Sequence, residues 1–358
     1  MSDIARLKRL MERAEKGETL TIGFFGGSIT QGSLAGTHEN TYAYRVFTWW
    51  KNRFPKAKFR YVNGGIGGTS SHFGVARAHR DLLMYRPDFV VIDFSVNDEL
   101  KEEAFFKESF EGVIRKVYDS ETRPAVVVLN NVYYDIGVNM QKAHNEVADY
   151  YGILHVSIKD TILPRIAAGE YKREELTPDN LHPNDKGHEL VANEICKLLQ
   201  SVKDVDSISW EEEQKKAAMT ANAYEESSIL TIANSSPKLD GFLTDTEEKK
   251  GHLDFFKNGW IGRQVGDAIH FTLEASCIAV QYRRTIHRPA PVARLVLDGD
   301  YSHPMILDGN FDEDWGDCLY LQPILHHGNR QKHRIDIEII KADDGLETEF
   351  YLMSLIYS

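Results

Sequence analysis

The first part of the chain alternates short apolar runs with stretches of helical periodicity, and this alternation restricts the fold more than any other feature. The apolar runs of strand length are residues 19–25, 59–63, 88–94, 125–129 and 153–156. The helical patterns are residues 3–17, 42–54, 71–85, 105–118, 140–150 and 190–199. Strands that alternate with helices predict βαβ units, in which helices cover both faces of a mainly parallel sheet. We therefore expect a three-layer α/β/α domain over residues 1–204.

The pattern changes after this domain. Residues 205–235 are predicted to form a connector, with a charged, helix-like stretch at 211–228. Residues 236–358 contain short alternating runs separated by turn residues, a pattern typical of an antiparallel β-sandwich. The clearest of these runs are residues 268–273, 277–282, 293–297, 333–339 and 350–356.

Three polar segments stand where a site is expected in such a sheet. Ser28 follows the first strand, Asn97 follows the third strand, and Asp179 and His182 precede the last helix. Sites of parallel α/β sheets form at the carboxyl ends of the strands. A serine nucleophile, an amide donor, and a histidine held by a carboxylate are the parts needed for acyl transfer through a serine ester.

Each segment alone also has a simpler explanation. A Gly-Gly-Ser at a strand end is commonly just a turn. Asn97 is also a suitable cap for a following helix, and the Asp-x-x-His segment fits a capping Asp179 beside a surface His182. The combination is therefore more specific than any of its parts.

A glycine-rich turn at residues 63–69 follows the second strand. It does not fit Gly-x-Gly-x-x-Gly, because Ser70 stands three positions after Gly67, and it lacks the Gly-Lys-Ser/Thr of a phosphate loop. We therefore disfavour nucleotide binding. A backbone N–H at this loop-to-helix entrance suits an oxyanion instead.

In order and context, residues 18–202 resemble the SGNH (GDSL-type) hydrolase superfamily, which implies a flavodoxin-like domain. The resemblance rests on Gly-Gly-Ser-Ile-Thr, on the glycine-rich turn, on Ser-Val-Asn-Asp and on Asp-x-x-His. It implies no cofactor. It implies a catalytic triad and three oxyanion donors, namely Ser28, Asp179 and His182, and the N–H groups of Ser28 and Gly68 with the amide of Asn97.

The chain departs from the family pattern at two positions. Gly27 stands for the Asp of Gly-Asp-Ser, and Ser95 stands for the Gly of Gly-x-Asn-Asp. Neither change removes a catalytic group, but both reshape the floor of the site. The α/β-hydrolase fold is disfavoured, because Gly-x-Ser-x-Gly would need glycine at Thr30.

Other polar residues are candidates for substrate contact. Gln31 and Asn130 follow strand ends, and the C-terminal domain offers Arg284 and Trp315, a combination that suits sugars. An ordinary Arg–Asp network explains the C-terminal residues equally well. Residues 240–358 loosely resemble the jelly-roll accessory modules of carbohydrate esterases.

The sequence predicts no metal site. The acidic loop at 308–315 hints at calcium, but its spacing does not fit an EF-hand. His72, His79 and His188 have no ligand partners at useful spacing, so solvated or structural roles are expected.

The net charge, the N-terminal sequence and the cysteines restrict the classes of partner and the location that we expect. A formal net charge of −12 argues against nucleic acid or an anionic membrane as the main partner. The N-terminus shows no signal peptide, and no apolar run approaches membrane-spanning length. Three widely spaced cysteines suggest reduced thiols, so a cytoplasmic protein is expected. The oligomeric state stays open, a homo-oligomer included.

We therefore expect a serine esterase that removes acetyl or other small acyl groups from oligosaccharides. Two alternatives remain. A lipid or thioester hydrolase would need an apolar acyl tunnel, whereas the residues around Ser28 are polar. A carbohydrate-binding protein on a silent esterase scaffold would not need an intact triad.

Overall fold

The computed structural model describes residues 3–206, 215–251, 253–343 and 348–358. These divide into two compact units, Met1–Glu225 and Glu226–Ser358. The boundary between the units lies inside the segment 205–235, where the sequence predicts a connector. Each unit is described by itself.

The N-terminal unit contains one five-stranded parallel sheet, in the order β2-β1-β3-β4-β5. Its strands are β1 (Thr19–Gly26), β2 (Lys58–Gly65), β3 (Phe89–Asp93), β4 (Ala125–Asn130) and β5 (Leu154–Ser157). This is the doubly wound, flavodoxin-like order. The sequence prediction of a mainly parallel sheet is confirmed.

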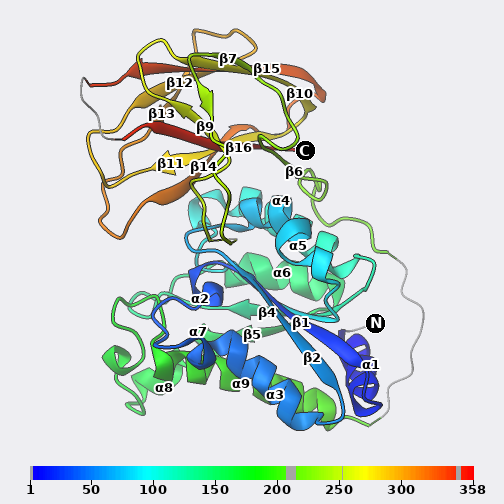
Figure 1. Cartoon of the computed structure of the whole chain (residues 1–358). Coiled ribbons are helices and arrows are strands. Elements are labelled where there is room, and N and C mark those ends of the chain that lie inside the picture. The colour runs from blue at the N-terminus through cyan, green and yellow to red at the C-terminus, as the bar shows by residue number, and fades with distance from the viewer. Residues whose placement is uncertain (1–2, 207–214, 252, 344–347) are drawn as a thin grey trace. The chain divides into compact units, whose positions relative to one another are not determined.

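Helices cover both faces of this sheet (Figure 1). The helices on one face are α4 (Ser71–Asp81), α5 (Glu103–Tyr118) and α6 (Gln141–Tyr151), and those on the other are α1 (Asp3–Glu15), α3 (Tyr42–Arg53) and α9 (Asp185–Lys203). Short helices α2 (Ser28–Gln31), α7 (Ile158–Thr161) and α8 (Leu163–Ala167), with 3-10 turns at His38–Asn40, Leu83–Tyr85, Leu100–Glu102 and Arg173–Glu175, complete the unit. Trp50 and Phe89 are fully buried in the core between the sheet and the second layer of helices.

The central strands read as continuous apolar runs because both of their faces are buried. Every residue of β3 and β4 is buried, and β1 exposes only Thr19 at its start. At their carboxyl ends, Gly26 of β1 pairs with Gly65 of β2 and with Asp93 of β3. This edge of the sheet carries the loops in which the sequence predicts the site.

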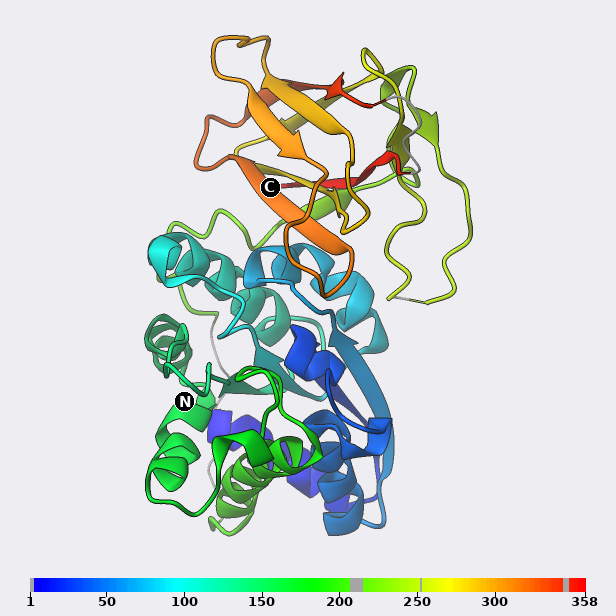
Figure 2. The same cartoon turned by 90° about the vertical axis from the view of Figure 1, so that its left-hand side faces the viewer.

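The C-terminal unit is built from antiparallel strands, and its described residues form no helix (Figure 2). One sheet has the order β13-β12-β15-β10-β7 and the other β14-β11-β16-β9-β8, with β6 also paired to β16. The strands are β6 (Ser228–Leu230), β7 (Lys238–Asp240), β8 (Leu243–Thr244), β9 (Trp260–Gly262), β10 (Ala268–Ala275), β11 (Ile278–Arg284), β12 (Val292–Leu297), β13 (Met305–Asp308), β14 (Cys318–Leu325), β15 (Gln331–Lys341) and β16 (Phe350–Tyr357). Buried residues of both sheets, such as Phe271 and Leu352, form one core.

The expectation of a helix-like stretch at 211–228 is wrong for its described residues. Residues 211–214 lie outside the described residues, and 215–227 form turns and irregular backbone that end at β6. The carboxylate of Glu111 on α5 accepts the N–H groups of Met219 and Thr220, and Glu108 accepts the N–H of Ala223. These N–H groups therefore bond to side chains of α5, where a helix would have turned them towards its own carbonyls.

No helix among the described residues has both the length and the apolar character needed to cross a membrane.

Candidate active site

Ser28 lies at the carboxyl end of β1, where the chain turns sharply into a short helix. Gly27 precedes this helix, and Ser28 is its first residue. Gly27 donates its N–H to the Asp93 carbonyl (3.2 Å), and its own carbonyl accepts the N–H of Gln31 (3.0 Å). The N–H groups of the first turn of a helix have no partner within the helix, so the Ser28 N–H is available to an oxyanion.

A continuous hydrogen-bonded chain joins Ser28, His182 and Asp179. The Ser28 hydroxyl is 2.7 Å from His182 Nε2, and His182 Nδ1 is 2.6 Å from Asp179 Oδ2. Because an ionised carboxylate only accepts, Nδ1 donates to Asp179 and leaves the Nε2 lone pair to receive the serine proton. Residues 154 positions apart in the sequence thus lie in one hydrogen-bonded chain.

The Asp-x-x-His segment closes on itself as a turn. Oδ1 of Asp179 accepts the N–H groups of Leu181 (3.0 Å) and His182 (2.7 Å). Partial burial alone would raise the pKa of Asp179, but its hydrogen bonds from the His182 ring and from these N–H groups hold that pKa below its usual value. The carboxylate therefore stays ionised and fixes the orientation of the imidazole.

Asn97 and the glycine turn flank Ser28. A Cβ placed on Gly27 would lie 2.9 Å from Asn97 Cγ, and one placed on Gly67 would lie 3.6 Å from Ser28 Cβ. Gly68 has a left-handed backbone with φ of 66°. The structure thus brings the three segments predicted to supply oxyanion donors to one place.

Gln31 holds the glycine turn. Its Oε1 accepts the N–H of Gly67 at 2.6 Å. The side-chain oxygen of Gln31, a predicted substrate contact, is therefore already hydrogen-bonded to the glycine turn. Asn130 is fully buried and donates to Asn145 Oδ1 (2.8 Å). The structure therefore assigns Asn130 to packing between β4 and α6 instead of to a surface that faces substrate.

The two departures from the family pattern have physical consequences. The side chain of Asn97 packs against Gly27, so its observed position leaves no room for a side chain at residue 27. The hydroxyl of Ser95 donates to the Asn131 carbonyl (3.1 Å) and lies 3.4 Å from Asp93 Oδ1. Ser95 therefore adds a polar contact beneath the site that a glycine could not make.

Two supports of the site were missed by the sequence analysis. Arg77 on α4 is fully buried and donates to the carbonyl of Gly26 (2.8 Å), at the end of β1, and to that of Gly64 (2.5 Å), in the glycine turn. Burial lowers the pKa of Arg77 to about 10 despite its ion pair with Asp81. A lone arginine in a helical pattern gave no signal of this contact.

The second support is the start of α9, directly after His182. Asp185 accepts the N–H of Gly36 (2.6 Å) and the side-chain amide of Asn40 (2.9 Å). His188 is fully buried and accepts the N–H of Tyr42 at Nδ1 (3.2 Å). The loop after the nucleophile is therefore tied to the helix that follows the base.

In the C-terminal unit, Arg284 and Trp315 have different surroundings. The Arg284 guanidinium donates to the Asn310 carbonyl (2.9 Å) and lies over the rings of Phe311 and Tyr320. Trp315 stacks edge-on against Phe311 but remains 57 % exposed. Of the two predicted sugar contacts, Trp315 is exposed and Arg284 is half-buried.

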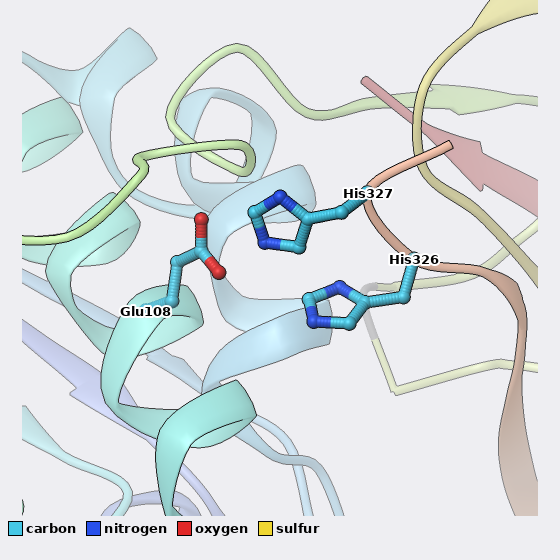
Figure 3. A group of neighbouring side chains, drawn as sticks. All are labelled: Glu108, His326 and His327. Atoms are coloured by element: carbon cyan, nitrogen blue, oxygen red, sulfur yellow. The ribbon is translucent and has the colours of Figure 1, made fainter. Parts of the chain in front are cut away.

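Figure 3 draws Glu108 together with His326 and His327. The two histidines follow β14 in the C-terminal unit, with ring centroids 4.2 Å apart. Glu108 belongs to α5 of the N-terminal unit, where it accepts the N–H of Ala223 at 2.8 Å.

The chain is similar to known acyl hydrolases and esterases. The model of the GDSL-like lipase/acylhydrolase family matches residues 24–190. An acetylxylan esterase from Geobacillus stearothermophilus is 27 % identical over 158 residues, which cover 39 % of this chain and 71 % of that protein.

Two solved structures resemble the whole chain. One is a two-domain esterase active on acetylated mannans, 46 % identical, with a TM-score of 0.96 over 99 % of this chain and 95 % of that one. The other is that esterase co-crystallised with mannopentaose, with a TM-score of 0.95, the same identity and the same coverage of both chains. Residues 24–190 therefore form a GDSL-like lipase/acylhydrolase domain, and the protein is a carboxylic ester hydrolase.

Proposed function

We propose that this protein removes acetyl groups from acetylated oligosaccharides through a covalent acyl-enzyme on Ser28. The observation that carries the proposal is the hydrogen-bonded chain from Ser28 Oγ through both ring nitrogens of His182 to Asp179. An activated nucleophile needs a base within hydrogen-bond reach and a third group that orients the base.

In the acylation step, Ser28 Oγ attacks the ester carbonyl carbon while His182 Nε2 takes the serine proton. The carbonyl oxygen becomes an oxyanion, which accepts from the N–H groups of Ser28 and Gly68 and from the amide of Asn97. Collapse of this intermediate breaks the bond to the sugar oxygen, and His182 returns the proton to that oxygen. A free sugar hydroxyl leaves, and the acetyl group stays on Ser28.

In the deacylation step, His182 takes a proton from water, and the resulting hydroxide attacks the acetyl-serine carbonyl. The same donors hold the second oxyanion. Collapse breaks the bond to Ser28 Oγ, which regains its proton from His182, and acetate leaves. The balance is one ester and one water consumed for one hydroxyl and one acetic acid released.

The substrate class is supported by similarity. The relative of 46 % identity acts on acetylated mannans, and the more distant one is an acetylxylan esterase. We therefore propose acetylated manno-oligosaccharides as the first substrates to test and acetylated xylo-oligosaccharides as the second.

The test is acetate release from acetylated manno-oligosaccharides, with 4-nitrophenyl acetate as a small reference ester. Ser28→Ala and His182→Ala should each lower kcat by at least ~10³-fold without loss of folding. Asp179→Ala should cost less, because that side chain is 44 % exposed and water can partly replace it. Ser201→Ala, on the exposed side of α9, is the matched control. Near-normal turnover by Ser28→Ala would refute the mechanism.

A further inference from the structure

A second histidine–aspartate pair lies behind the proposed oxyanion hole, and the mechanism above does not use it. His144 Nε2 is 2.9 Å from Asp98 Oδ2, and both side chains are fully enclosed. Asp98 directly follows Asn97 in the sequence. A buried ion-type pair costs desolvation unless its hydrogen bonds are well satisfied, so its presence here calls for a role.

The two oxygens of Asp98 join two segments of the site. Oδ2 accepts a hydrogen bond from Nε2 of His144 on α6. Oδ1 accepts the N–H of Ser71, the first residue of α4, at 2.8 Å. Ser71 comes three residues after Gly68. One carboxylate therefore connects the residue next to Asn97 with the end of the glycine turn.

The imidazole of His144 is itself held in one state. Its ring stacks on Phe110 of α5, with centroids 3.7 Å apart and an interplanar angle of 7°. Nε2 must carry the proton that Asp98 accepts, while Nδ1 is buried without a hydrogen-bond partner among the described residues. A proton on Nδ1 would be left without an acceptor, so the neutral Nε2–H tautomer is favoured.

The loop that carries Asn97 has further fixed points. The N–H groups of Asn97 and Asp98 both donate to the Phe94 carbonyl at 3.0 Å. The Ser95 carbonyl accepts the N–H of Met140, at the start of α6. The side chain of Asp98 is held in turn by His144 and by the N–H of Ser71.

We propose that Asp98 and His144 are positioning residues that hold Asn97 in the geometry that binds the oxyanion. This inference rests on the proposed function. Donors fixed before the reaction need no reorganisation as charge develops, so loss of the pair acts on the transition state more than on the bound substrate. The expected signature is a lower kcat with an unchanged KM.

Two variants test the pair. His144→Phe keeps a flat ring against Phe110 but removes the donor. Asp98→Asn keeps the shape and the acceptor for Ser71, but its amide forces His144 into the tautomer with a buried, unpartnered Nδ1–H. Removing one oxyanion donor outright costs ~10²–10³-fold in kcat, so a displaced donor should cost about 10–100-fold, with KM changed less than about twofold.

His144→Gln is the rescue variant, because its Nε2 amide can reach the place of the imidazole Nε2–H and should restore most of kcat. His155→Phe is the matched control: it removes another histidine that bonds an aspartate, since His155 of β5 lies 3.2 Å from Asp149 of α6. Rates are measured on 4-nitrophenyl acetate, and thermal unfolding checks that each variant is folded.

A double-mutant cycle with Asn97→Ala separates positioning from general destabilisation. If the pair acts through Asn97, Asp98→Asn should cost much less in the Asn97→Ala background than in the wild type. The same fold-loss in both backgrounds, or wild-type kcat in folded His144→Phe and Asp98→Asn, would overturn the inference. Ser28→Ala distinguishes the two failures: if it is inactive while the positioning variants are normal, only the positioning role is wrong.

Discussion

Gly27→Ala should disable the oxyanion hole while leaving the triad intact. The substitution adds a single methyl group beside Ser28. Placed on the observed backbone, this Cβ would lie 2.9 Å from Asn97 Cγ and nearer still to Asn97 Oδ1, closer than real Cβ contacts allow. Either the backbone at residue 27 or the side chain of Asn97 must move.

The backbone is the less mobile of the two. Gly27 is bonded on both sides, through its N–H to Asp93 and through its carbonyl to Gln31. The Asn97 side chain therefore gives way, and its amide leaves the oxyanion. Loss of one such donor costs ~2.7–4 kcal/mol of transition-state binding, so kcat should fall about 10²–10³-fold with little change in KM. Overpacking should also cost ~1–3 kcal/mol of stability.

The assay is steady-state hydrolysis of 4-nitrophenyl acetate, with unfolding monitored by temperature. Gly251→Ala is the matched control, because a Cβ there meets no atom within 4 Å. The double variant Gly27→Ala with Asn97→Ala should be no slower than Asn97→Ala alone, because the displaced group is already absent. Wild-type kcat in Gly27→Ala, or multiplied losses in the double variant, would refute the reasoning.

Three other predictions concern buried titratable groups and the C-terminal unit. Burial raises the pKa of Asp93 to about 6, although hydrogen bonds from Asn131 and Ser95 oppose this shift. Protonated Asp93 therefore contributes fully to the free energy of unfolding below pH ~4, and this contribution is lost as the pH rises through about 6. Asp93→Asn should therefore raise the free energy of unfolding at pH 7, by at most about 3 kcal/mol, in urea titrations; an unchanged pH slope between 4 and 6 would contradict this. Burial lowers the pKa of His188 to about 4, so stability should fall as pH drops from ~6.5 to ~4, and His188→Asn, which keeps an acceptor for the Tyr42 N–H, should flatten that slope. Trp315→Ala should weaken binding of manno-oligosaccharides, measured by calorimetry, while 4-nitrophenyl acetate turnover stays normal; unchanged sugar binding would remove Trp315 from the candidate contacts.

The sequence by itself determined the layered α/β domain, the β-rich second domain and the order of the polar segments. These follow from local periodicity, because buried parallel strands are apolar throughout and amphipathic helices repeat every 3.6 residues. The closeness of Ser28 and Asn97 could also be predicted, since both follow the carboxyl ends of parallel strands, which share one edge of the sheet. The roles of these residues in catalysis, the substrate contacts and the cytoplasmic location stay predictions.

Only the tertiary structure decided which polar residues support the site and which merely pack. Arg77, Asp98 and His144 act through hydrogen bonds to residues distant in the sequence, so no local pattern reveals them. The irregular backbone of residues 215–227 has the same cause, because carboxylates of α5 hold its N–H groups against the helical preference of the segment. Helix propensity describes the conformation that a segment favours in isolation. In this segment, hydrogen bonds to buried carboxylates of α5 outweigh that preference.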